Sequence, residues 1–249
     1  MRRILFAIAV CLSPAAATGA DPSPAAEGWV DLLKSGPDGP WKKVDPKWIT
    51  ATDVTLNPDR PTRLKPTPGD GPVWVNGETG RLPDLVTKQN FKDVEVHVEF
   101  LLAKNSNSGI KFHAVYEIQI TDSAAKKDAA LSGDDCGGIY PRAELKPSYH
   151  HIDHGIPPKV NAAKPAGEWQ TLEVVFRSPR FDTLGEKTEN AKVVKAVLNG
   201  RVIHENQELK TPTGNNWSKK ETPTGPFMLQ ADHGPVAFRN VRIRELREK

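Results

Sequence analysis

Apolar and polar residues alternate over several short stretches of this chain, which is the periodicity of β-strands. The clearest stretch is 93–100 (DVEVHVEF), where every second residue from Val94 to Phe100 is apolar. Residues 169–177 (WQTLEVVFR) alternate in the same way. No stretch shows a helical period of comparable strength. The pattern therefore predicts an all-β fold built from antiparallel sheets.

Turn residues separate these stretches. The pair Asn199-Gly200, inside 192–202, predicts a type I′ hairpin because both residues accept positive φ. The run NSNSG at 105–109 is expected to form a turn. The stretch 110–120 that follows is long enough for one bent strand or for a hairpin pair.

The end of the chain carries two more expected strands, at 227–230 and 236–246. We expect them to pair with each other around the turn DHGP at 232–235, because strands joined by a short turn usually form a hairpin.

Two stretches lack a clear period. Residues 57–80 are rich in Pro, Gly and Thr and are expected to run over the surface, apart from an apolar run at 73–75. Residues 124–165 form a segment far longer than an ordinary connection. Long loops in compact domains are usually functional, so we expect this one to border a binding site.

The first twenty residues have the pattern of a secretory signal peptide. A basic start at Arg2 and Arg3 precedes an apolar stretch and a small-residue exit, with cleavage expected after Ala17 or Ala20. We expect residues 21–27 to form a linker and 28–249 one β-sandwich domain. The mature protein is then expected to be secreted or periplasmic, with no membrane span.

The charge and the cysteine count limit the binding partners and the covalent cross-links that we expect. The net charge of +3 falls to +1 without Arg2 and Arg3, and basic and acidic residues are interleaved, so we expect no nucleic-acid partner. Cys136 is the only cysteine after processing, which excludes an intramolecular disulfide and favours a buried, apolar role. The pattern makes no prediction of oligomeric state.

The strand 116–123 (YEIQITDS) carries the most suggestive chemistry. Successive side chains of a strand point to opposite faces, so its apolar residues share one face and its polar residues the other: Tyr116, Ile118 and Ile120 against Glu117, Gln119 and Thr121. The polar face could simply be solvated. It could also be the floor of a groove for a polyhydroxylated ligand, because carboxylate and amide groups match sugar hydroxyls.

Several phrases, in this order, together resemble one family, the secreted 3-keto-disaccharide hydrolases, over roughly residues 85–246. The phrases are NSGI at 107–110, YEIQITDS at 116–123, CGGIY at 136–140, KPAGEWQT at 164–171, NG at 199–200, LQADHG at 229–234 and FRNV at 238–241. The resemblance implies a concanavalin A-like jelly-roll sandwich in which one curved sheet holds carbohydrate. It also implies cleavage of glycosides oxidised to a ketone at carbon 3.

The chain departs from this family's pattern at two points. It has HAV at 113–115 where the family often has Gln-Gly-Arg, and Ala231 intervenes before Asp232. Both changes fall near the expected groove, so the family's substrate details are not transferred.

The chemistry implied by the family needs a base, a stabiliser for an enolate and an acid for the leaving oxygen. The candidate catalytic residues are Glu117, as base or metal ligand, His233, as base or acid, and Asp122. The candidate substrate-binding residues are Gln119, Lys111, His113, Tyr140, Gln230 and Arg239. A divalent metal ion is a candidate cofactor, with no ligand set assigned.

Each candidate also has a structural interpretation. Glu117 could be solvated, and His233 could belong to a structural turn. Asp122 could accept a hydrogen bond at a strand end, Arg239 could point outward, and Tyr140 could stack on a sugar or close a loop. The cluster HHIDH at 150–154 contains metal-ligand types, but a solvated loop is the favoured interpretation.

Two classes of function compete. An ordinary sandwich glucanase is disfavoured because the residue two after Glu117 is the amide Gln119, which cannot be its acidic partner. No serine-hydrolase or phosphate-loop motif is present. We therefore expect an enzyme acting on 3-keto-glycosides, with a non-catalytic carbohydrate-binding module as the alternative.

Overall fold

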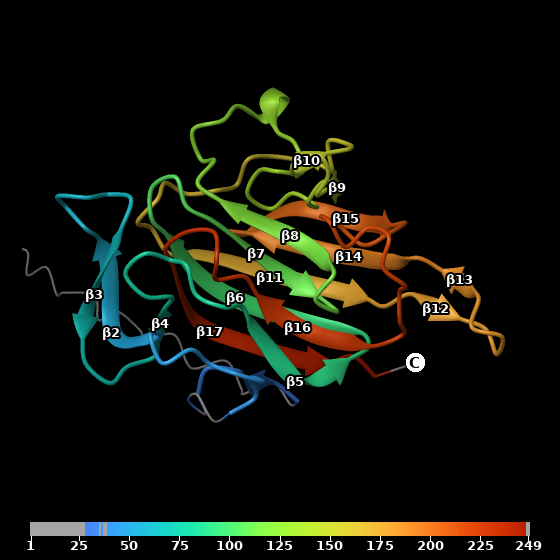
Figure 1. The fold of residues 1–249 in the computed structure, drawn as a ribbon, viewed down its shortest axis with the longest axis horizontal. Helices are drawn as coiled ribbons and strands as arrows, with labels where there is room; N and C mark the ends of the chain where they lie inside the picture. The colour runs from blue at the N-terminus through green and yellow to red at the C-terminus, as the bar shows by residue number, and fades with distance from the viewer. Residues whose placement is uncertain (1–27, 35, 37–38, 248–249) are drawn as a thin grey trace, which may run out of the picture.

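The computed structural model describes residues 28–34, 36 and 39–247, and its regular secondary structure is almost entirely β-strand (Figure 1). Two antiparallel sheets pack face to face in a concanavalin A-like jelly-roll sandwich, which confirms the predicted fold class. Within the described ranges, no helix has the length and apolar character needed to cross a membrane. The predicted signal peptide and linker lie outside the described residues.

The larger sheet has nine strands. In spatial order they are β15 (Arg201–Leu209), β14 (Ala191–Leu198), β11 (Gln170–Arg177), β6 (Val94–Leu102), β17 (Val236–Glu245), β4 (Val73–Val75), β2 (Ile49–Leu56) and β3 (Leu64–Pro68), with β1 (Val30–Asp31) pairing with β17.

The smaller sheet has four strands and lies in front of the larger one in Figure 1. Their spatial order is β5 (Leu85–Phe91), β16 (Gly225–Leu229), β7 (Asn107–Phe112) and β8 (Tyr116–Thr121). The described residues also form two short ribbons, β9 (Ala143–Glu144) with β10 (His150–His151) and β12 (Arg180–Phe181) with β13 (Lys187–Glu189), and one 3-10 turn, η1 (Asp128–Ala130).

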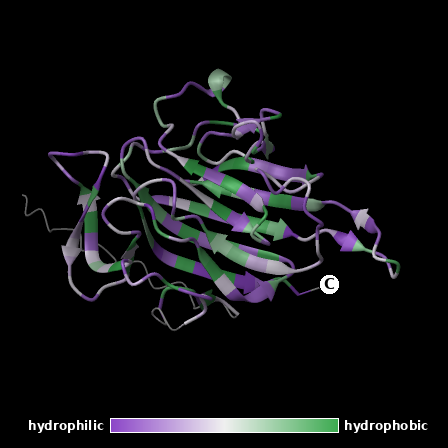
Figure 2. Cartoon of the chain, in the orientation of Figure 1, coloured by the Kyte–Doolittle hydropathy of each residue, from purple (hydrophilic) through white to green (hydrophobic). Residues whose placement is uncertain are grey.

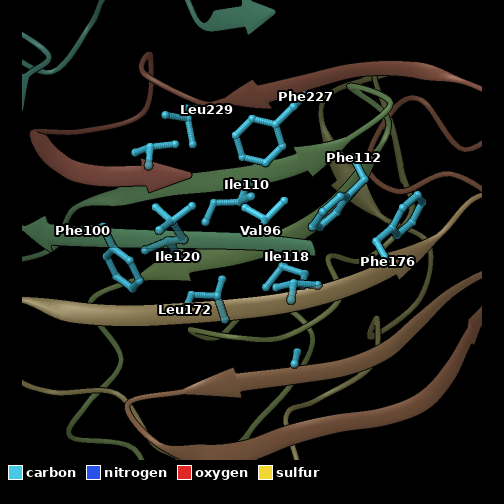
Figure 3. Close-up of a cluster of buried hydrophobic side chains, with 14 of the residues drawn as sticks. Val96, Phe100, Ile110, Phe112, Ile118, Ile120, Leu172, Phe176, Phe227 and Leu229 are labelled. Atoms are coloured by element: carbon cyan, nitrogen blue, oxygen red, sulfur yellow. The ribbon is translucent and has the colours of Figure 1, made fainter. Parts of the chain in front are cut away.

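The core fills the space between the two sheets. Figure 2 shows the alternation of apolar and polar residues along the strands, and Figure 3 shows the apolar side chains of both sheets meeting. Phe112 of the smaller sheet stacks on Phe176 of the larger sheet at 4.6 Å between ring centroids. The predicted inward residues of β6, from Val94 to Phe100, are at most 2% exposed.

Most of the predicted strands and turns are confirmed. The stretch 110–120 contributes to the β7–β8 hairpin, and β4 occupies the apolar run 73–75. Asn199 and Gly200 have φ values of 51° and 79°, as a type I′ turn requires. The turn expected at 105–109 is shorter than predicted, because β7 begins at Asn107, and β3 was not expected.

The predicted pairing of the last two strands is wrong. β16 pairs with β5 and β7 in the smaller sheet, whereas β17 pairs with β6 in the larger sheet. The connection at 230–235 therefore crosses from one sheet to the other. Packed sheets lie about 10 Å apart, a distance that six residues span easily.

Asn76 holds this crossing connection in place. Its side-chain amide donates to the carbonyls of Ala231 and Gly234 at 2.9 and 2.8 Å, and its oxygen accepts from the Val236 N–H at 2.8 Å. The residue is fully buried. One side chain thus bonds to three backbone groups at the crossing and at the start of β17.

We expect Asn76→Ala to lower the free energy of unfolding by about 2–4 kcal/mol, because the buried Gly234 carbonyl and Val236 N–H lose this partner. Denaturant unfolding followed by tryptophan fluorescence measures the change. Asn190→Ala is the control, because that side chain makes one long, solvent-exposed contact, with Glu208 at 3.4 Å. Equal effects of the two variants would contradict the anchoring role.

Candidate active site

A buried ion pair lies on the outer face of the smaller sheet. Lys111 and Glu117 are directly opposite each other in the β7–β8 register, so their side chains emerge on the same face. Lys111 Nζ lies 3.1 Å from Glu117 Oε2, and the Glu117 side chain is 4% exposed. The polar face predicted for β8 is therefore not a solvated surface at Glu117.

Gly109 makes room for this carboxylate. A Cβ atom at position 109 would lie 2.1 Å from Glu117 Oε1, closer than any real contact allows. The backbone of β7 thus forms the floor under the Glu117 side chain, and only glycine permits this approach.

A cavity of about 340 Å³ opens above the ion pair. The sheet contributes its floor, and three connections contribute its walls. The lining residues are Asn107, Lys111, Glu117 and Gln230 from the sheet and its strand ends, Tyr140 and Tyr149 from the long loop, Gly214, Asn215 and Asn216 from the β15–β16 connection, and His233 from the crossing connection.

The long loop is held against the edge of the sheet by backbone hydrogen bonds. Along β8, the Gly137 N–H donates to the Gln119 carbonyl at 2.8 Å, and the Tyr140 N–H donates to the Glu117 carbonyl at 3.1 Å. The Glu117 N–H in turn donates to Thr213 Oγ1 at 3.0 Å. These bonds place Tyr140 beside Glu117, and they confirm that the 124–165 segment borders the cavity.

Burial dominates the electrostatics of the floor. It raises the pKa of the Glu117 carboxyl above its ordinary value, and the Lys111 ammonium only partly offsets that rise. Burial also raises the pKa of the nearby Asp84 carboxyl, which accepts a hydrogen bond from the Ala231 N–H at 2.8 Å.

His233 forms a dyad with its neighbour Asp232, whose carboxylate accepts a hydrogen bond from His233 Nδ1. This bond raises the pKa of the His233 imidazole and lowers the pKa of the Asp232 carboxyl. The charges of Lys111 and Glu117 also act on His233, which places the dyad close to the ion pair.

The structure brings five of the predicted site residues to one cavity. They are Glu117, Lys111, Tyr140, Gln230 and His233. The shared β7–β8 hairpin explains the first two, and the cavity walls supply the others. Their catalytic and binding roles stay predictions.

Four predicted site residues lie away from the cavity lining. Gln119 follows Glu117 on the same face, but it is buried and does not line the cavity. Its backbone N–H donates to the Gly138 carbonyl, and its carbonyl accepts from the Gly137 N–H. Asp122 accepts a hydrogen bond from the Asn105 N–H at 3.0 Å, the strand-end role considered for it.

His113 and Arg239 are engaged in the fold itself. His113 is buried in the β7–β8 turn, 2.9 Å from Ser178 Oγ, because the turn directs its ring toward the core. Arg239 lies on the larger sheet, where its guanidinium pairs with Glu99 at 2.6 Å and covers the Trp169 ring at 4.0 Å.

Sequence reasoning missed several residues that the structure places at or beside the cavity. They are Asn107, Tyr149, Asn215, Asn216 and Asp84. The sequence did offer a clue to Asn107, because this residue starts the NSGI phrase. In the structure its buried Oδ1 has no hydrogen-bond partner among the described residues. The others belong to loops or strand ends whose positions depend on tertiary contacts.

Among the residues that the structure describes, no three His, Cys, Asp or Glu side chains gather as a metal-ligand set. In the 150–154 cluster, Asp153 pairs with Arg142 at 2.7 Å and His151 bonds to Tyr140. Cys136 is buried, as expected, and burial raises the pKa of its thiol to about 12.

A concanavalin A-like sandwich with a polar cavity on the outer face of its smaller sheet is thus the frame of the site. The family model for the 3-keto-alpha-glucoside-1,2-lyase-like domain matches residues 27–244, and the chain belongs to this family. The resemblance to 3-keto-disaccharide hydrolases is confirmed. No curated protein sequence matches the chain.

Two crystal structures from Parabacteroides distasonis, both of candidate glycosyl hydrolases, are similar to this chain. The first is 26% identical, with 72% of this chain and 73% of the other covered and a TM-score of 0.53. The second is 18% identical, with 89% and 95% covered and a TM-score of 0.51, and it shows the fold alone.

Because a Cβ atom at Gly109 would meet the Glu117 carboxyl, we expect Gly109→Ala to destabilise the protein by about 1–3 kcal/mol. Adding Glu117→Ala should recover much of that loss, since it removes the clashing group. A double-mutant cycle in denaturant measures the coupling. Simple additivity of the two changes would show that the carboxyl is not what Gly109 accommodates.

Proposed function

We propose that this protein is an exported enzyme that cleaves 3-keto-glycosides by removing the proton on carbon 2, eliminating the substituent on carbon 1 and adding water to the product. The observation that carries the proposal is the buried Glu117 carboxyl, 3.1 Å from the Lys111 ammonium in a polar cavity. The family of the chain and its N-terminal pattern support it.

Glu117 suits the role of base. Burial raises the pKa of its carboxyl, which makes the carboxylate a stronger proton acceptor than an exposed one, while Lys111 favours its ionised form. A ketone at carbon 3 acidifies the neighbouring carbon–hydrogen bond, so one well-placed carboxylate can remove that proton.

Lys111 suits the role of enolate stabiliser. When Glu117 takes the proton, its negative charge disappears and an equal charge develops on the ketone oxygen. The ammonium then loses one anionic partner and gains another, so the cavity keeps its charge balance through the step. The protonated His233 imidazole adds a second donor for the same oxygen.

The remaining cavity residues match the hydroxyls of a sugar. Asn107, Gln230, Asn215 and Asn216 offer amide donors and acceptors around the floor. Ordinary glycosidases use two carboxylates that face each other across the substrate. Asp84 accepts a hydrogen bond from the Ala231 N–H and does not line the cavity, so it does not form such a pair with Glu117.

A non-catalytic carbohydrate-binding module is the alternative. The test is release of 4-nitrophenol from the 4-nitrophenyl 3-keto-α- and β-glucosides, with the unoxidised glucosides as controls. We expect release from a keto substrate only, and Glu117→Gln should reduce kcat by about 10²–10⁴-fold.

The control variant is Glu144→Gln, a change of the same kind at an exposed position of β9. Parallel reactions with EDTA test the candidate divalent metal ion. Sugar binding without release from any substrate would overturn the enzyme and leave the binding module.

The pKa shifts predict a bell-shaped dependence of kcat/KM on pH. Activity should rise as Glu117 ionises, at a pH above the ordinary carboxyl pKa, because burial raises its pKa. It should fall as His233 loses its proton, at a pH above the ordinary imidazole pKa, because the bond to Asp232 raises its pKa.

Asp232→Asn should therefore move the alkaline limb to lower pH and leave the acid limb in place. Asp59→Asn, at an exposed position far along the chain, is the matched control. An alkaline limb that does not move in Asp232→Asn would remove His233 from this role.

A further inference from the structure

A hydrogen-bonded chain of side chains runs from the surface to the cavity wall. The Tyr140 hydroxyl lies 2.9 Å from the Tyr149 hydroxyl and 3.0 Å from His151 Nε2. Tyr140 lines the cavity, and its backbone is bonded to that of Glu117. His151 is exposed on β10, where it can exchange protons with water.

We propose that the Tyr140 hydroxyl gives its proton to the departing glycosidic oxygen and that His151 returns a proton from solvent to Tyr140. This inference rests on the proposed function and names the acid that the elimination needs. His151 acts through Tyr140 and is a positioning and relay residue, whereas Tyr140 is catalytic.

Glu117 takes the carbon 2 proton, and the electron pair of that bond passes into the enolate. The pair returns to form the carbon 1–carbon 2 double bond, while the carbon 1–oxygen bond breaks and its pair stays on the oxygen. That oxygen takes the Tyr140 proton, Tyr140 takes one from His151 Nε2, and His151 and Glu117 exchange theirs with water.

The surroundings of Tyr140 suit this task. Burial, with the Tyr149 hydrogen bond and the Glu117 charge, raises the pKa of the Tyr140 hydroxyl, so it stays protonated until a basic oxygen is formed beside it. The tyrosinate formed then has two donors at hydrogen-bond distance. The His151 ring lies edge-on to the Tyr140 ring at 5.2 Å and 89°, which fixes the direction of Nε2.

Leaving groups of different basicity test the relay. A 4-nitrophenolate leaves without a proton, whereas the methoxide of a methyl glycoside needs one. We therefore compare 4-nitrophenyl and methyl 3-keto-α-glucosides with wild type, Tyr140→Phe, His151→Phe and His150→Phe. His150 is the matched control, because it is the neighbouring exposed histidine and its Nδ1 bonds to the Ser148 carbonyl at 2.9 Å.

We expect Tyr140→Phe to lose about 10²–10⁴-fold in kcat on the methyl glycoside and less than about 3-fold on the nitrophenyl glycoside. His151→Phe should lose at least about 10-fold on the methyl glycoside only, and His150→Phe should match wild type on both.

Equal losses on the two substrates would overturn the relay, because they would show a structural role. So would a loss in Tyr140→Phe with none in His151→Phe. Wild type that cleaves neither keto substrate would instead overturn the proposed function, and the relay with it.

Discussion

The three-residue turn at 113–115 sets the register that places Lys111 opposite Glu117. A buried carboxylate alone costs several kcal/mol, and the ammonium at 3.1 Å offsets part of that cost. A slip of one residue would put the two side chains on opposite faces of the sheet, so one of them would point into the apolar core without its partner. His113 and Ala114 adopt positive φ in this turn, and the bond from His113 to Ser178 holds them there. The geometry of this turn thus fixes the position of the ion pair.

The two faces of the smaller sheet have different roles. The inner face carries apolar residues such as Ile118, which pack against the larger sheet, and the outer face carries the polar residues of the cavity. The period of two along β7 and β8 separates the faces so sharply that Glu117 and Ile118, adjacent in sequence, serve the site and the core. Loops from three distant parts of the chain then close the cavity above the polar face.

The sequence predicts the features that depend on the order of neighbouring residues. Alternation identified β6 and β11, Asn199-Gly200 identified a hairpin, and the YEIQITDS phrase identified the floor of the site. Prediction failed where distant contacts decide. The strands β16 and β17 are close in sequence but find better partners in different sheets, and Tyr149 and Asn215 reach the cavity through loops without periodicity. Arg239 was a candidate substrate-binding residue, yet it lies on the larger sheet, where its side chain contacts Glu99 and Trp169.

The backbone bonds between the 137–140 segment and β8 have one more effect. β8 is the last strand of the smaller sheet, and an uncovered last strand is a template on which another polypeptide can pair. The loop that brings Tyr140 to the cavity occupies that template itself. Residues 137–140 therefore protect the protein from intermolecular aggregation. Any remodelling of the loop for a new substrate must preserve this protection.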